Sequence, residues 1–226
     1  MVVRIPAVLA AAELTTLRDQ LGVASWTSGS ATAGFQSVAV KDNQQLPHGD
    51  PLARECGALI VAALERNPLF LSAALPRHVF PPMFNRYENG MAFGAHVDNA
   101  VRQVPATSFR LRTDLSATLF LSAPADYDGG ELVIQDTYGE HRVKLPAGDL
   151  VLYPAGSVHR VEAVTRGARV ASIFWVQSMV RDPIARELLF ELDDSIRELS
   201  AAGTARAPLV RLTGLYHNLV RRWGDL

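Results

Sequence analysis

Between residues 78 and 178 the chain alternates every few residues between a short β-rich run and a turn that contains glycine or proline. The runs are residues 79–87, 116–121, 131–135, 141–144, 149–153, 159–163 and 169–177. The turns between them include Asp128-Gly129-Gly130, Pro146-Ala147-Gly148, Pro154-Ala155-Gly156 and Arg166-Gly167. Closely spaced short strands with such turns are typical of a β-sandwich or jelly roll.

Helical patterns lie on both sides of this β-rich region. Leu14, Leu17 and Leu21 form a stripe that stops at Gly22, and a second apolar run follows Asp50-Pro51, a capping residue before a proline at the first helical position. Between these two runs, residues 35–40 have the pattern of a strand.

After the β-rich region, Asp182-Pro183 marks another helix start, and Gly203 separates that run from a last amphipathic segment. We therefore expect an α+β fold in three parts. They are an N-terminal helical segment packed on the core (residues 1–77), a β core (78–178) and a C-terminal helical extension (179–226). The extension needs a partner for its apolar stripe, so a homodimer through these helices is one expectation.

Composition limits the location and the partners of the chain. Lys plus Arg number 22 and Asp plus Glu 23, so no basic excess points to nucleic acid or an anionic membrane. No stretch approaches 18 uncharged apolar residues, and we expect no membrane span. Cys56 is the one cysteine, which fits a reducing compartment, and acidic Glu13 follows the N-terminal apolar run at once. We expect a cytoplasmic protein without a signal peptide.

Two histidines and an aspartate have the spacing of a metal site. His96 and Asp98 would project to the same face of a strand, although such a pair is common by chance. His159 follows a strand and a Pro/Gly turn. Two histidines and one carboxylate that leave coordination positions open form the facial triad of non-haem iron(II) oxygenases.

Arg169 lies ten residues after His159, with Thr165-Arg166-Gly167 as the expected turn of a hairpin between them. A turn centred on Val164 would set Arg169 opposite His159. A turn centred on Thr165 would set it on the same face, about 7 Å along the strand. This second register suits a small dicarboxylate that chelates a metal at one end and meets a guanidinium at the other. A turn centred between residues would direct Arg169 to the wrong face, and a solvated edge-strand charge is the alternative.

The combination of His96-x-Asp98, His159 and Arg169 resembles the 2-oxoglutarate/Fe(II) dioxygenase superfamily. Residues 84–96, 128–132 and 146–153 are similar to the prolyl 4-hydroxylase branch. Residues 111–118 and 174–182 are similar to a narrower group, the bacterial PKHD-type hydroxylases, and the resemblance extends to 67–70 and 216–219. It thus covers nearly the whole chain.

This resemblance implies a double-stranded β-helix core that binds Fe(II) and the cosubstrate 2-oxoglutarate. It implies His96, Asp98 and His159 as iron ligands, Arg169 as the anchor of the 2-oxoglutarate C5-carboxylate, and Tyr87 near 2-oxoglutarate. It also implies L-ascorbate as a helper reductant. The expected activity is hydroxylation of an unidentified small-molecule or peptide substrate by molecular oxygen, with release of succinate and CO2.

Two other functions use the same residues. A non-catalytic sensor would bind iron or 2-oxoglutarate and signal through the helical tail. A cupin-like zinc hydrolase would need a general base, and Arg169 argues against it. The substrate itself is open: Arg102, Arg110 and Arg112 follow the metal-binding strand and would favour an anionic substrate if they border the pocket, whereas a solvated loop is the alternative.

Overall fold

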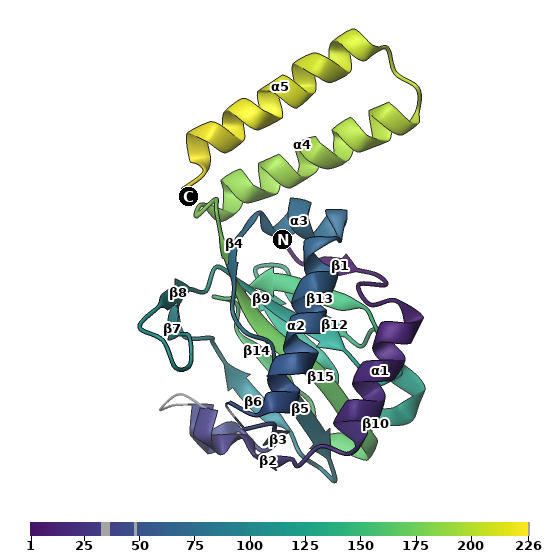
Figure 1. The fold of residues 1–226 in the computed structure, drawn as a ribbon. Coiled ribbons are helices and arrows are strands. Elements are labelled where there is room, and N and C mark those ends of the chain that lie inside the picture. The colour runs from purple at the N-terminus through teal and green to yellow at the C-terminus, as the bar shows by residue number, and fades with distance from the viewer. Residues whose placement is uncertain (33–36, 48, 226) are drawn as a thin grey trace.

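The structure is a computed structural model that describes residues 1–32, 37–47 and 49–225. Two antiparallel sheets face each other in its centre (Figure 1). The main sheet has the strand order β1 (Val3–Ile5), β13 (Leu150–Pro154), β9 (Leu115–Phe120), β15 (Val164–Ser178), β5 (Met83–Glu88), β3 (Gln44–Gln45) and β2 (Thr27–Ser28); β10 (Tyr127–Gly129) and β4 (Pro76–Val79) also pair with β15. The minor sheet has the order β12 (Gly139–Val143), β11 (Leu132–Asp136), β14 (His159–Val161) and β6 (Phe93–His96). The predicted jelly-roll core, a double-stranded β-helix, is confirmed.

The main sheet is buried on both faces, and its strands sort their side chains by chemistry. On β9, Leu115, Ala117 and Leu119 belong to the largest apolar core of the described residues. Ser116 and Thr118 alternate with them and line the space between the two sheets. One face of this strand therefore stabilises the fold, while the other presents polar groups to an internal pocket.

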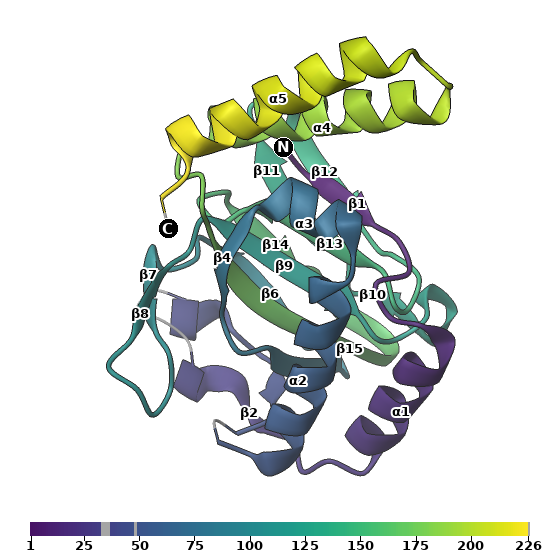
Figure 2. The same ribbon diagram turned by 45° about the horizontal axis from the view of Figure 1, so that its top comes forward.

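Helices cover the outer face of the main sheet (Figures 1 and 2). They are α1 (Ala11–Gly22), α2 (Pro51–Glu65) and the short α3 (Pro68–Ala74). Asp50 caps α2 as predicted, since its carboxylate accepts the Leu52 N–H at 2.8 Å, and Asn67 caps α3 by accepting the Phe70 N–H at 2.9 Å. No single helix among the described residues is long and apolar enough to cross a membrane; α2 and α3 pass that test only as a pair bent by 86°, and both pack into the main core.

The C-terminal extension is a helical hairpin that projects from one end of the sandwich (Figures 1 and 2). It consists of α4 (Pro183–Ala201), which begins at the predicted Asp182 cap, and α5 (Arg206–Trp223). Leu189 of α4 packs with Leu75 and Val180 in a small separate core. The hairpin is thus attached by its base, close to the end of β15.

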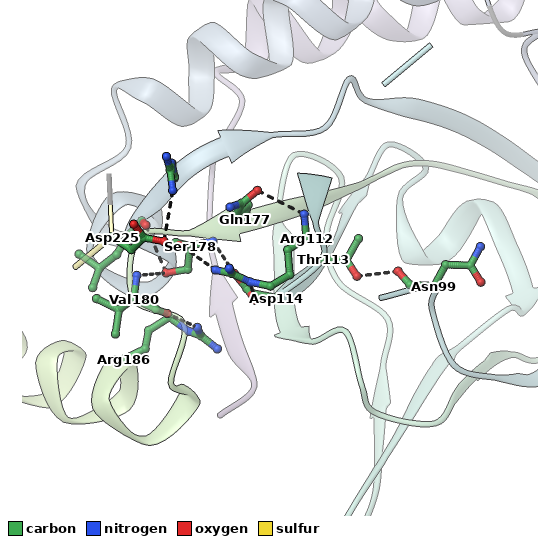
Figure 3. Close-up of polar contacts among 11 residues, drawn as sticks. Asn99, Arg112, Thr113, Asp114, Gln177, Ser178, Val180, Arg186 and Asp225 are labelled. Atoms are coloured by element: carbon green, nitrogen blue, oxygen red, sulfur yellow. Dashed lines mark hydrogen bonds and ion pairs between the residues drawn. The ribbon is translucent and has the colours of Figure 1, made fainter. Parts of the chain in front are cut away.

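A second, smaller hairpin follows β6. It consists of β7 (Val101–Gln103) and β8 (Arg110–Arg112). Its base carries a set of polar contacts that we call the junction cluster: Arg112, Asp114, Ser178 and Arg186 (Figure 3).

In the junction cluster, Arg112 donates to both carboxylate oxygens of Asp114, at 2.7 and 2.9 Å, and the Ser178 N–H donates to the same carboxylate at 2.9 Å. Arg186 of α4 donates to the Val180 carbonyl at 2.8 Å. These bonds tie the base of the small hairpin to the end of β15 and to the C-terminal extension.

Two local predictions were wrong. Residues 35–36 of the predicted strand 35–40 lie outside the described residues, and Ser37–Val40 forms a 3₁₀ helix, η2. Val40 at the end of this helix packs on Gly94 of β6, where an added Cβ would lie 2.8 Å from the Val40 side chain. Asp128-Gly129-Gly130 is not a simple turn, because Tyr127–Gly129 forms β10 and pairs with β15 across a register shift. Two further 3₁₀ helices are η1 (Gly29–Thr32) and η3 (Pro124–Asp126).

Candidate active site

His96 and His159 lie side by side on neighbouring strands of the minor sheet. They are directly opposed in the β6–β14 register, and their ring centroids lie 4.2 Å apart. Each ring turns its Nδ1 to a backbone carbonyl, that of Gly94 at 2.8 Å for His96 and that of Ser157 at 3.0 Å for His159. A proton on Nδ1 fixes both tautomers, so each Nε2 keeps its lone pair for a metal.

Asp98 completes the group from just beyond the strand. The sequence placed it on the same strand as His96, but β6 ends at His96 and Asp98 lies in the loop that follows. Its Oδ2 accepts a hydrogen bond from Ser116 Oγ at 2.6 Å and lies 3.7 Å from His159 Nε2. One ligand atom from each of the three residues lies within 4.8 Å of the others, which is compatible with coordination of one ion.

The local electrostatics favour metal binding by His96. Burial, together with the neighbouring His159, lowers the pKa of His96 to about 4. The imidazole is therefore neutral near pH 7, and a neutral ring is the form that coordinates a metal.

Arg169 lies in the same pocket as the three ligands, and it is one of the most deeply buried side chains of the described residues. It is 1% exposed, and its Nε and Nη1 have no hydrogen-bond partner among those residues. Its guanidinium carbon lies 5.3 Å from the Phe120 ring and 5.4 Å from the ring of Tyr87, the residue opposite it on β5. A buried guanidinium with unsatisfied donors is costly, so this arrangement suits an anionic ligand that enters the pocket.

Arg169 does not reach this position by the predicted hairpin. β14, which carries His159, pairs with β6 and β11 in the minor sheet, whereas β15, which carries Arg169, belongs to the main sheet. Gly167 pairs with Tyr127 of β10 and is not part of a β14–β15 turn. The two side chains meet because the sheets face each other, and the chain crosses from one sheet to the other between them.

Two asparagines of the pocket had no recognisable sequence signal. Asn43 and Asn85 are 4% and 2% exposed, and both carry side-chain atoms without a partner among the described residues. Gly130 (φ +68°) lies against the stem of Arg169, and a Cβ added to it would be 3.0 Å from Arg169 Cδ. A single serine or asparagine on an inner strand face has no spacing that reveals it, although Gly130 was visible as part of the Asp-Gly-Gly motif.

The three arginines of residues 99–113 have different environments. Arg110 is exposed, and Arg112 belongs to the junction cluster. Arg102 lines the pocket together with Lys41. Burial and the neighbouring Arg102 lower the pKa of Lys41 to about 8.

Comparisons with known proteins identify the class and then the family. The sequence profile of the 2OG-Fe(II) oxygenase superfamily matches residues 82–177, the region that contains His96, Asp98, His159 and Arg169. The profile of the PKHD-type hydroxylase C-terminal domain matches residues 184–225. A PKHD-type hydroxylase from Burkholderia cenocepacia (strain HI2424) is 60% identical over 226 residues, which is 100% of both chains. The chain therefore belongs to the PKHD-type hydroxylases, a family of 2-oxoglutarate- and Fe(II)-dependent dioxygenases.

Solved structures share the fold at much lower sequence identity. A prolyl-4-hydroxylase from Pseudomonas putida has a TM-score of 0.51 at 21% identity, over 78% of this chain and 92% of that one. HygX from Streptomyces hygroscopicus, solved with nickel and 2-oxoglutarate bound, has a TM-score of 0.51 at 14% identity, over 76% and 81%. At these identities the comparison shows the fold alone.

Proposed function

We propose that His96, Asp98 and His159 bind Fe(II), that Arg169 binds the distal carboxylate of 2-oxoglutarate, and that the enzyme hydroxylates a small molecule or an amino-acid side chain. The observation that carries this proposal is the unsatisfied guanidinium of Arg169, buried in the same pocket as a His/Asp/His ligand set. The donor set fits ferrous iron, because it supplies two imidazoles and one carboxylate and leaves positions for other ligands. The match of residues 82–177 to the 2OG-Fe(II) oxygenase superfamily supports the choice of cosubstrate.

Each residue has a defined task in this proposal. The carbonyls of Gly94 and Ser157 orient the two imidazoles, and Ser116 orients the Asp98 carboxylate. Arg169 gives a charge-assisted, geometrically specific contact at the far end of the cosubstrate, and Tyr87 flanks that contact. When bound, ferrous iron and 2-oxoglutarate supply the oxygen-activating chemistry, which releases succinate and CO2.

The test separates catalysis from sensing. The full chain is loaded with Fe(II) without oxygen, 2-oxoglutarate binding is measured by calorimetry, and oxygen is then admitted while succinate is assayed across a panel of amino acids, peptides and metabolites. We expect binding first and succinate after oxygen, with a stimulated rate for true substrates. Binding without any succinate would contradict the proposal and favour a sensor.

L-ascorbate as reductant belongs to the same proposal. If it keeps the iron ferrous, prolonged reactions with ascorbate will give more succinate per enzyme than reactions without it, while the initial rate stays the same. An equal total yield would remove ascorbate from the scheme.

The cytoplasmic location and the homodimer are part of the proposal as well. Cys56 is buried and unpaired, in keeping with a reducing compartment. Ile184 and Leu188 of α4 and Val210 and Leu215 of α5 are exposed apolar side chains on the C-terminal hairpin. Light scattering of the full chain and of Leu188→Ser tests whether these helices join two copies: we expect a dimer that the substitution weakens, and a monomeric full chain would contradict it.

A further inference from the structure

The pocket contains a second cation that the iron and 2-oxoglutarate sites do not use. Arg102 lies on β7, directly opposite Leu111 of β8, so both side chains leave the same face of the small hairpin. Leu111 is buried in one apolar cluster with Phe80 and Trp175, and the Arg102 side chain lines the pocket beside them. The guanidinium carbon of Arg102 lies 3.9 Å from the Trp175 ring centroid and 5.4 Å from that of Phe80.

Aromatic rings orient this cation. Burial lowers the pKa of Arg102, and the Asp98 carboxylate, with which it makes no ion pair, raises it. The Arg102 side chain makes no hydrogen bond or ion pair with any residue that the structure describes, and it lies against the rings of Trp175 and Phe80. Arg112 lies on the neighbouring strand, on the opposite face of the same hairpin, and is bonded to Asp114 and the Ser178 carbonyl. A guanidinium stacked on indole keeps its N–H edges free for an oxyanion.

Trp175 adds a second free donor at the same place. Its Nε1 is buried and has no acceptor among the described residues, and the residue is 5% exposed. A buried indole N–H ordinarily finds an acceptor. Arg102 and Trp175 therefore present unsatisfied donors side by side, which calls for a ligand with acceptor oxygens.

The strand register places this pair beside the metal ligands and far from Arg169. Trp175 is directly opposite Ser116, whose hydroxyl bonds Asp98. Trp175 and Arg169 lie on the same face of β15 but six residues apart, roughly 20 Å at the rise of a β-strand. Arg102 and Arg169 thus lie at opposite ends of one pocket, with the candidate metal ligands near the Arg102 end, where Lys41 also lines the pocket.

We propose that Arg102 and Trp175 form a subsite for an oxyanion of the primary substrate, so that the substrate carries a carboxylate or phosphate close to the carbon that is oxidised. This inference rests on the proposed function, because it takes the Arg169 end of the pocket as occupied by 2-oxoglutarate. It names the substrate class: a small organic anion, in preference to a neutral or cationic molecule.

The first experiment observes the subsite directly and needs no knowledge of the substrate. The chain has three tryptophans, so its indole N–H region in a nitrogen-15 NMR spectrum has three signals, and Trp175→Phe assigns one of them. The full chain is loaded with Zn(II) and saturating 2-oxoglutarate, then titrated at constant ionic strength with benzoate, benzamide and inorganic phosphate. We expect a saturable shift of the Trp175 signal with benzoate or phosphate and none with benzamide.

Two variants on one hairpin provide the matched comparison. Arg102→Gln should weaken benzoate binding about tenfold or more, the loss of roughly one charged hydrogen bond. Arg110→Gln, which removes an exposed arginine from the same hairpin, should leave it unchanged. In both variants the affinity for 2-oxoglutarate should stay within about twofold of the wild-type value.

Several results would overturn the proposal. Equal shifts with benzamide and benzoate would show that the site does not distinguish an anion from a neutral molecule. Unchanged benzoate binding in Arg102→Gln would show that Arg102 does not bind the anion. A loss of 2-oxoglutarate affinity in Arg102→Gln as large as the loss for benzoate would assign Arg102 to the cosubstrate. If 2-oxoglutarate does not bind the wild-type chain at all, the proposed function fails, while the benzoate titration of the metal-free chain still reports on Arg102.

The turnover screen then identifies the kind of anion. Substrates are offered as pairs, each carboxylic acid with its primary amide and each phosphate ester with its parent alcohol, and succinate release is measured. We expect the anionic member to have at least about a tenfold higher kcat/KM and Arg102→Gln to remove most of that difference. A preference for the neutral member would contradict the assignment.

Discussion

The pocket and the junction cluster both contain buried or half-buried arginines, but only in the junction cluster do all the buried arginine donors have hydrogen-bond partners among the described residues. At the junction, Arg112 and Arg186 donate to Asp114, Ser178 and Val180, and none of the cluster's buried side-chain nitrogens or oxygens lacks a partner among the described residues (Figure 3). In the pocket, Arg169 has two donors without a partner there, and Arg102 is stacked but unpaired. A satisfied cluster stabilises the fold, whereas an unsatisfied one costs stability unless a ligand completes it.

The largest expected effect comes from removing the carboxylate ligand of the pocket. Asp98→Ala should abolish Fe(II) binding and succinate formation together, because two imidazoles alone cannot form the facial site. Metal content after dialysis and succinate release measure both losses. Full succinate production by a metal-depleted Asp98→Ala enzyme would disprove the ligand assignment.

Removal of the deep cation should affect the cosubstrate without affecting the metal. Arg169→Gln loses charged hydrogen bonds of roughly 2–3 kcal/mol, which corresponds to about 30- to 150-fold weaker 2-oxoglutarate binding. Iron content should be unchanged. Since the free guanidinium is unsatisfied, the ligand-free variant should be no less stable to urea than the wild type, and a large destabilisation would mean that Arg169 is mainly structural.

The hydroxyl that orients Asp98 should have a smaller effect. Ser116→Ala removes the 2.6 Å hydrogen bond to Asp98 but no ligand. Loss of such an outer contact typically lowers metal affinity about 10- to 100-fold. A competition titration with a metal chelator measures it, with Thr118→Val on the same strand face as the control; equal affinities in Ser116→Ala and the wild type would contradict this role.

The junction cluster should respond in the opposite way. Asp114→Asn weakens three hydrogen bonds, two from Arg112 and one from Ser178, and should lower the free energy of unfolding by about 1–3 kcal/mol. The affinity for 2-oxoglutarate of the protein that remains folded should be unchanged. Urea unfolding and calorimetry separate the two quantities, and a variant with normal stability but weak 2-oxoglutarate binding would reverse the comparison.

Sequence reasoning predicted the parts of the fold that local chemistry determines. The caps Asp50 and Asp182, each before a proline, correctly marked helix starts, and alternating short runs correctly indicated a jelly roll. The prediction of a hairpin between His159 and Arg169 was wrong, because turn residues do not reveal whether a chain returns along its own sheet or crosses to the facing one. Spacing in the sequence therefore identified the candidate residues of the site but predicted the wrong chain connection between them.

The remaining pocket residues required three-dimensional contacts. Ser116 and Asn85 are single polar residues on buried strands, and only the facing sheet shows that their side chains line a pocket. Of the three arginines after the metal strand, only the hairpin register distinguishes Arg102, which faces the aromatic rings, from the exposed Arg110.

The central claim is that Arg169, whose guanidinium has donors without a partner among the described residues, binds 2-oxoglutarate beside an iron site. An anaerobic calorimetric titration of 2-oxoglutarate into the Fe(II)-loaded full chain tests this claim most directly, with Arg169→Gln, Asp98→Ala and Asp114→Asn in parallel. We predict one equivalent bound per chain, with affinity lost in Arg169→Gln and Asp98→Ala and retained in Asp114→Asn. Undiminished binding of 2-oxoglutarate by Arg169→Gln would contradict it.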